Sequence, residues 1–146
     1  YKVGAAMDYP LMRVEEMYFI EAEALAASQG VAAGVSALES FMKTYRYDSY
    51  KCKATSLADF RKELMLQKRI EFWGEGIVYW DYKRLELKVT RGYPGTNCFV
   101  GQRLNSIEGY CAPWFNIFFS KFESLQNKAI VLNPNPSSVI SDWTGQ

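Results

Sequence analysis

The sequence contains no histidine. This absence excludes histidine-based acid-base catalysis, the Ser-His-Asp arrangement and every zinc motif that uses histidine. Cysteine is scarce as well, because Cys52, Cys98 and Cys111 do not pair evenly and show no Cys-x-x-Cys spacing. Cys98 and Cys111 flank a glycine-rich segment, where a disulfide and two free thiols both fit the sequence. We therefore expect neither a metal site nor a cofactor.

Long apolar runs and an excess of charge are also absent. A helix that crosses a bilayer needs about eighteen consecutive apolar residues, and no such run occurs. The first four residues, 1–4, have neither the basic nor the apolar region of a signal peptide. Lys and Arg number 17 against 16 Asp and Glu, so the net charge of +1 is too small to attract nucleic acid. These absences fit a cytosolic protein and a piece of a targeted protein equally.

The chain does contain enough apolar material to fold. Hydrophobic residues make up 49% of the 146 residues, and 16% are aromatic. A chain of this length fits one domain and can bury roughly two thirds of the surface that it exposes when unfolded. We therefore expect a globular domain with a real core.

Apolar spacings of three and four predict a helical hairpin over residues 9–46. Ser28, Gln29 and Gly30 end the first helix, with Gly30 suited to a left-handed cap, and the second helix covers residues 31–46. Two apolar stripes run along the first helix: Leu11, Val14, Tyr18, Ala22 and Leu25, and opposite them Met17, Ile20, Ala24 and Ala27. We therefore expect this helix to be packed on both sides. The hairpin resembles one tetratricopeptide unit.

The remainder divides into three segments. Residues 56–88 contain a third helix, capped by Ser56 and Asp59, and a short fourth helix over 77–88 after the interruption at Gly74 and Gly76. Residues 89–126 read as a variable loop region that packs back onto the helices, and 127–146 as a terminal segment. The expected fold class is therefore mostly α.

Glu71, Glu75 and Asp81 are the only obvious candidates for a pair of catalytic carboxylates of the glycosidase type. Basic residues are interleaved with them: Lys68, Arg69, Lys83 and Arg84. Carboxylates beside guanidinium groups keep a low pKa, whereas a catalytic acid needs a raised one. We therefore favour structural ion pairs and expect no enzyme.

Helical angle places Glu15 and Glu21 among apolar positions of the first helix, so both should be partly buried. Buried carboxylates need partners, and the basic residues near Lys68 and Arg84 are the most concentrated supply. The predicted ion-pair network comprises Glu15, Glu21, Lys68, Arg69, Glu71, Glu75, Asp81 and Arg84.

Tyrosine, tryptophan and asparagine gather in the loop region. Flat aromatic faces stack on sugar rings, while Asn and Arg side chains bond sugar hydroxyls. The candidate ligand-binding residues are Tyr93, Asn97, Arg103, Tyr110 and Trp114. Core packing is the competing interpretation for each of them, including Trp114.

Three segments resemble the SusD/RagB family. Residues 67–84, QKRIEFWGEGIVYWDYKR, are similar to its signature of a basic helix end, Glu-Leu-x-Phe-Glu-Gly, then Trp-Phe-Asp and Lys/Arg-Arg. The matching positions are Glu71, Glu75, Gly76, Trp80, Asp81, Lys83 and Arg84. Residues 9–25, YPLMRVEEMYFIEAEAL, resemble its Arg-x-x-Glu helix, and residues 127–134, NKAIVLNP, resemble its closing segment.

This resemblance implies a SusD-like helical fold and places the chain in the carboxy-terminal portion of a larger protein. It also implies a surface-exposed lipoprotein of the outer membrane, anchored by a lipid upstream of this chain. Such a protein captures a glycan or other nutrient and delivers it to a SusC-like TonB-dependent transporter, with no chemistry on the ligand. The alternatives are a glycoside hydrolase that uses Glu71, Glu75 and Asp81, and a tetratricopeptide-type protein-protein scaffold.

Overall fold

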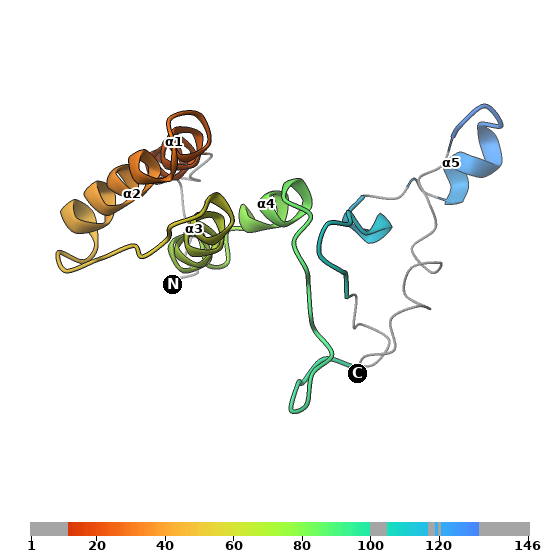
Figure 1. The fold of residues 1–146 in the computed structure, drawn as a ribbon. Coiled ribbons are helices and arrows are strands. Elements are labelled where there is room, and N and C mark those ends of the chain that lie inside the picture. Colours follow the sequence, from red (N-terminus) through yellow and green to blue (C-terminus); the bar gives the residue numbers. More distant parts are fainter. Residues whose placement is uncertain (1–11, 100–104, 117–118, 120, 132–146) are drawn as a thin grey trace, which may run out of the picture. The chain divides into compact units, whose positions relative to one another are not determined.

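The computed structural model describes residues 12–99, 105–116, 119 and 121–131. Within these ranges the regular structure is helical and contains no strand, which confirms the mostly α prediction. The elements are α1 (Val14–Ser28), α2 (Val31–Tyr45), α3 (Leu57–Glu71), α4 (Val78–Arg84), the 3-10 helix η2 (Pro113–Phe115) and α5 (Lys121–Gln126) (Figure 1). None of the helices in the described part is long and apolar enough to cross a membrane.

The chain divides into two units, residues 1–75 and 76–146. We refer to them as unit 1 and unit 2. The boundary lies between α3 and α4, inside the stretch 56–88 that the sequence presents as one segment. Each unit therefore has to be understood from its own contacts.

In unit 1, α1 and α2 form the hairpin that the apolar spacing predicts. Gly30 joins them with a φ of 103°, a left-handed value that glycine adopts without strain. Gly34 allows the two helices to approach closely, because a Cβ added there would lie 2.4 Å from the Cβ of Ala26 and 2.6 Å from the carbonyl oxygen of Ala22. The hairpin therefore depends on the smallest side chains at its crossing.

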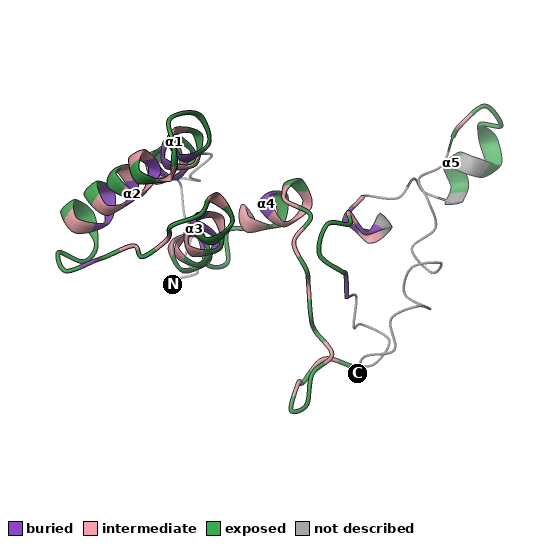
Figure 2. Cartoon of the chain, viewed as in Figure 1, coloured by how far each residue is buried: buried purple, intermediate pink, exposed green. Residues whose placement is uncertain are grey.

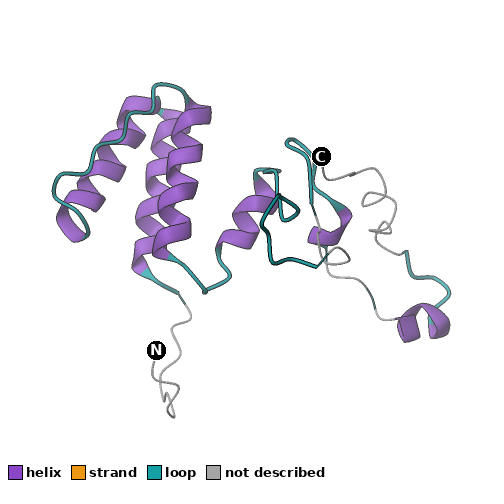
Figure 3. Cartoon of the chain, turned by 90° about the horizontal axis from the view of Figure 1, so that it is seen from below, coloured by secondary structure: helices purple, strands orange, loops and turns teal. Residues whose placement is uncertain are grey.

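The core of unit 1 is aromatic. Phe19 on α1 meets Phe41 of α2 edge to face at 5.3 Å between ring centroids, and Phe72 after α3 at 5.6 Å. Leu38, Phe60 and Leu64 are buried with them. Figures 1 and 3 show α1, α2 and α3 side by side around this core.

The expectation that α1 is packed on both sides was wrong. Its buried face carries Phe19, Ala22 and Ala26, whereas the second predicted stripe, Met17, Ile20, Ala24 and Ala27, is exposed. In the first stripe, Leu11 lies outside the described residues, Val14 and Tyr18 are exposed, and Leu25 is half-buried. Because α1 is apolar around most of its circumference, periodicity alone does not identify the face that meets α2 and α3.

Side chains attach the loop before α3 to the helices. Ser56 caps α3 by accepting a hydrogen bond from the Asp59 backbone N–H at 3.1 Å, as the sequence predicts. The Tyr50 hydroxyl donates to Glu63 on α3 at 2.7 Å, and Glu39 on α2 accepts from the Cys52 backbone N–H at 3.0 Å. The loop is thereby held between α2 and α3.

In unit 2, α4 ends at Arg84, four residues before the predicted end at Lys88. Glu86 adopts a φ of 51°, in the left-handed region. Its N–H donates to the Lys83 carbonyl and the Leu87 N–H donates to the Tyr82 carbonyl, the double pattern of a Schellman cap. Glycine usually occupies this position, so the sequence gives no sign of the stop.

Residues 86–92 and 105–109 run alongside each other after α4. Gly109 N–H donates to the Glu86 carbonyl at 2.9 Å, and Ser106 N–H donates to the Val89 carbonyl at 3.0 Å. The side chains of Asn105 and Ser106 complete this pairing by accepting from the backbone N–H groups of Arg91 and Val89. Both residues are buried, and the facing backbone satisfies their polar atoms. Figure 2 shows that buried stretches also occur outside the helices.

Candidate functional site

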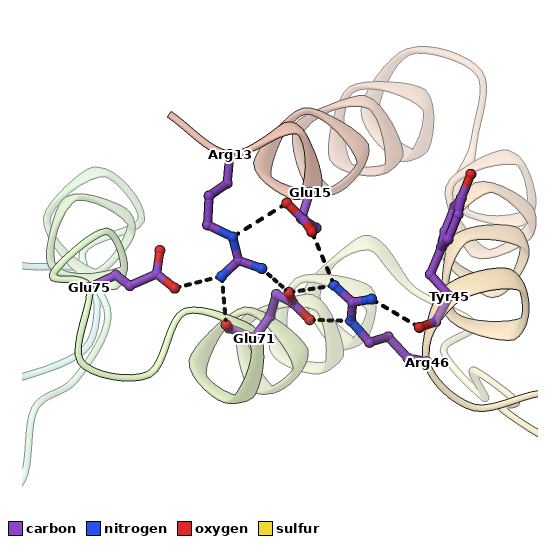
Figure 4. Close-up of polar contacts among 6 residues, drawn as sticks. All are labelled: Arg13, Glu15, Tyr45, Arg46, Glu71 and Glu75. Atoms are coloured by element: carbon purple, nitrogen blue, oxygen red, sulfur yellow. Dashed lines mark hydrogen bonds and ion pairs between the residues drawn. The ribbon is translucent and has the colours of Figure 1, made fainter. Parts of the chain in front are cut away.

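Two arginines organise the acidic residues of unit 1 (Figure 4). Arg13, at the start of α1, donates to the carboxylates of Glu15, Glu71 and Glu75, the last at 2.5 Å. Arg46, at the end of α2, donates two hydrogen bonds of 2.7 Å to Glu71 and one of 3.3 Å to Glu15. We call these five residues the arginine clamp. The clamp joins α1, α2 and the end of α3 at one point.

The clamp holds Glu71 as a carboxylate. Hydrogen bonds from Arg46 and then from Arg13 keep the pKa of Glu71 below its usual range, although burial acts in the opposite direction. A glycosidase acid needs a raised pKa, so the surroundings of Glu71 favour a structural role. The guanidinium groups also cover aromatic rings, since Arg13 lies 5.1 Å from the Phe72 centroid and Arg46 lies 5.4 Å from that of Phe41.

The clamp contains only part of the predicted ion-pair network. Glu15, Glu71 and Glu75 belong to it. Lys68 is buried on α3, and Arg69 is exposed. Asp81 and Arg84 form a separate pair at 2.9 Å within α4 of unit 2.

The expected burial of Glu21 was wrong, because the residue is exposed on the side of α1 opposite Phe19. Sequence reasoning also missed Arg13 and Arg46 as the basic partners. Both lie at helix ends, from which a long side chain can reach a neighbouring helix. Arg13 was visible in the Arg-x-x-Glu motif, but nothing local marks Arg46.

The predicted ligand-binding residues lie in unit 2, apart from Arg103, which is outside the described residues. Tyr93 and Asn97 are exposed at one end of the paired segments 86–92 and 105–109, around the turn at Gly95. Tyr110 is also exposed, but it follows Gly109 at the other end of the pairing. Tyr93 and Tyr110 therefore lie at opposite ends of the paired segments 86–92 and 105–109.

An aromatic cluster connects α4 with η2. The Tyr79 hydroxyl donates to the carbonyl of Phe115, and the two rings lie 5.5 Å apart. Trp114 stacks on Phe115 at 4.1 Å, and Trp80 meets Tyr79 edge to face at 5.2 Å. Phe115 is buried, Trp114 is half-buried, and Trp80 remains 61% exposed. We call these four residues the aromatic cluster.

This cluster contains Trp114, which the sequence predicts as a ligand-binding residue, and Trp80, which it does not. Trp80 presents a broad indole ring to solvent, held by Tyr79 beneath it. The Nε1–H of Trp114 is buried and meets no hydrogen-bond acceptor among the described residues. An exposed aromatic face suits the stacking of a sugar ring.

A surface depression in unit 1 is lined by residues of a different kind. Lys53, Asp59, Lys62 and Glu63 surround it, with Ala54 and Leu66. No aromatic side chain lines it, so it provides no stacking face. The three cysteines are all half-buried.

Comparison with known protein families gives a match over most of the chain. The model of a family described as the SusD family matches residues 2–141, which is nearly the whole chain. Neither the curated proteins nor the solved structures that were searched contain a match.

Proposed function

The chain belongs to the SusD family, and on this premise we propose that it forms part of a cell-surface protein that binds a glycan and delivers it to a SusC-like TonB-dependent transporter. The family match and the helical structure support this proposal. The protein would lie at the surface of the outer membrane, with its lipid anchor upstream of these residues.

The observation that carries the glycan proposal is the exposed aromatic surface of unit 2. Trp80 is 61% exposed, Tyr93 is 56% exposed and Tyr110 is 39% exposed. A sugar ring has an apolar face that stacks on such rings, and its hydroxyl groups bond to nearby amides and to loop backbone. We assign Trp80 and Trp114 to the main contact and Tyr93, Asn97 and Tyr110 to flanking contacts.

Binding without chemistry fits the surroundings of the acidic residues. Arg13 and Arg46 bond Glu71, and Arg13 also bonds Glu75. Arg84 bonds Asp81, whose side chain is only 8% exposed. Each carboxylate thus has a guanidinium partner, and the pKa of Glu71 lies below its usual range, whereas protonation of a glycosidic oxygen requires a neutral acid. We therefore propose a carrier function and not hydrolysis.

Calorimetric titration with a panel of oligosaccharides tests the proposal. One glycan should bind, and Trp80→Ala should weaken its binding about tenfold, which corresponds to about 1.4 kcal/mol. Trp114→Ala should act in the same direction, with smaller losses for Tyr93→Ala and Tyr110→Ala. Tyr47→Ala is the matched control, because Tyr47 is an exposed aromatic residue of unit 1.

The outcome distinguishes glycan contact from core packing as the role of each aromatic residue. Circular dichroism must show that each variant keeps its helical content. Unchanged affinity in folded Trp80→Ala and Trp114→Ala variants would remove the aromatic cluster from the binding site. Product formation from any glycan in the panel would contradict the carrier function.

A further inference from the structure

Tyr79 of α4 connects the members of the aromatic cluster. Its ring lies 5.2 Å from the ring of Trp80 and 5.5 Å from that of Phe115 in η2, measured between centroids. Its hydroxyl group donates a hydrogen bond to the backbone carbonyl of Phe115. Trp114 in turn stacks on Phe115 at 4.1 Å. The two tryptophans are therefore linked through Tyr79 and Phe115.

The position of η2 depends on contacts outside the segment. η2 has three residues, and so short a helix does not hold its own place. Phe115 and the preceding Ala112 are buried in unit 2. Apolar burial is not directional, whereas a hydrogen bond has a preferred length and angle. The hydroxyl group of Tyr79 therefore supplies the directional contact between α4 and η2.

We propose that Tyr79 is a positioning residue, which fixes the separation of Trp80 and Trp114 and thereby favours a glycan long enough to contact both rings. This inference rests on the proposed glycan-binding function. Trp80 presents its ring to solvent, and the Nε1–H of half-buried Trp114 is buried. Trp114 is thus left with ring carbons for contact with a ligand, which suits the apolar face of a sugar.

The arrangement of the four rings selects for ligand length. One sugar ring covers about one aromatic ring, whereas the rings of Tyr79 and Phe115 connect Trp80 with Trp114. A glycan that stacks on both tryptophans therefore extends over several sugar units. The second stacking contact is intramolecular once the first has formed, and it strengthens binding when the tryptophans are already held at the required spacing.

Tyr79→Phe tests this role, because it removes the hydroxyl group and keeps the aromatic ring. The probes are linear hexasaccharides of glucose, mannose, xylose and galactose, each compared with its free monosaccharide in the whole protein to which the chain belongs. Tyr79→Phe should raise the dissociation constant of the hexasaccharide that binds about fivefold, as expected for one lost hydrogen bond. The dissociation constant of its monosaccharide, measured by NMR titration, should stay unchanged, because a single sugar ring needs only one tryptophan.

Tyr82→Phe is the matched control. Tyr82 is a half-buried tyrosine of the same helix that takes no part in the aromatic cluster. Its replacement should leave both dissociation constants unchanged.

Fluorine NMR of the protein labelled with 5-fluorotryptophan gives a second readout that needs no glycan. The resonance of Trp114, assigned with Trp114→Phe, should shift in Tyr79→Phe and keep its position in Tyr82→Phe. A Trp114 resonance that does not move in Tyr79→Phe would overturn the positioning role whether or not a glycan binds.

The binding data can contradict the inference in two further ways. One is an unchanged hexasaccharide affinity in Tyr79→Phe. The other is an equal loss of affinity for hexasaccharide and monosaccharide, which would mean that Tyr79 acts on the fold of unit 2 and not on the spacing of the tryptophans. Failure of the glycan-binding function itself is a different result, because none of the probes would then bind the wild type.

Discussion

The two units of this chain are stabilised by different kinds of contact. In unit 1, three helices of fifteen residues each share an aromatic core and are joined by the arginine clamp, so side chains meet side chains across helices. In unit 2, α4 has seven residues, and the buried groups Asn105 and Ser106 bond to backbone N–H groups of a facing loop. The spacing of apolar residues therefore predicts the helix packing of unit 1, but it does not indicate the side-chain-to-backbone hydrogen bonds of unit 2.

The largest effect should come from Gly34 in unit 1. Glycine to alanine in a helix usually stabilises by up to about 1 kcal/mol. Here the added methyl group would overlap Ala26 and the backbone oxygen of Ala22. We expect Gly34→Ala to lower the free energy of unfolding by about 2 to 3 kcal/mol, measured by urea denaturation.

The control for this change is Ser36→Ala, which also places alanine in α2 but at an exposed position. It should be neutral or slightly stabilising, by about 0.5 kcal/mol. If Gly34→Ala and wild type had the same free energy of unfolding, close approach of α1 and α2 at Gly34 would not contribute to stability.

Glu71 should give the next largest effect, because it accepts hydrogen bonds from both arginines of the clamp and its side chain is only 11% exposed. We expect Glu71→Gln to cost about 2 kcal/mol at pH 7, since two guanidinium groups lose their shared counter-charge. Glu75→Gln is the control. Its side chain is 36% exposed and pairs with Arg13 alone, so the loss should stay below about 1 kcal/mol.

The effect of Glu71 should depend on pH in a defined direction. Its pKa in the folded chain lies below the ordinary value of 4.5, so its contribution is complete above about pH 4.5 and is lost as pH falls through the folded pKa. The stability difference between wild type and Glu71→Gln should therefore be constant near neutral pH and shrink in acid. A difference that grows below pH 4.5 would contradict the ionised carboxylate.

The smallest effect should come from unit 2. Asn105→Ala removes the acceptor for the backbone N–H groups of Arg91 and Gly92. We expect a local loss of about 1 to 2 kcal/mol, seen as faster hydrogen exchange at these two amides. Asn127→Ala is the matched control, because Asn127 makes an exposed side-chain bond to the Ala129 N–H. Unit 1 amides should exchange at unchanged rates in both variants.

Much of unit 1 could be predicted from the sequence. The spacing of apolar residues predicted α2 and the start of α3 to within one residue, and Ser56 with Asp59 predicted the cap. The motifs at residues 9–25, 67–84 and 127–134 identified the family that the later match showed. The basic residues that surround Glu71 and Glu75 in the sequence predicted ion pairs for both, but the bonds that Figure 4 shows come from Arg13 and Arg46 instead.

The rest depended on tertiary structure. The sequence determined that α1 is a helix, but its apolar residues lie on most sides, and only packing against Phe41 and Phe72 selected Phe19, Ala22 and Ala26 as the buried face. The arginine partners of Glu71 lie 25 and 58 positions away along the chain, beyond any local pattern. The end of α4 was likewise decided by Glu86, whose left-handed backbone is held by the Schellman cap and by the Gly109 N–H. Local periodicity encodes helices, whereas the choice of face, partner and helix end is fixed by contacts that form only when distant segments meet.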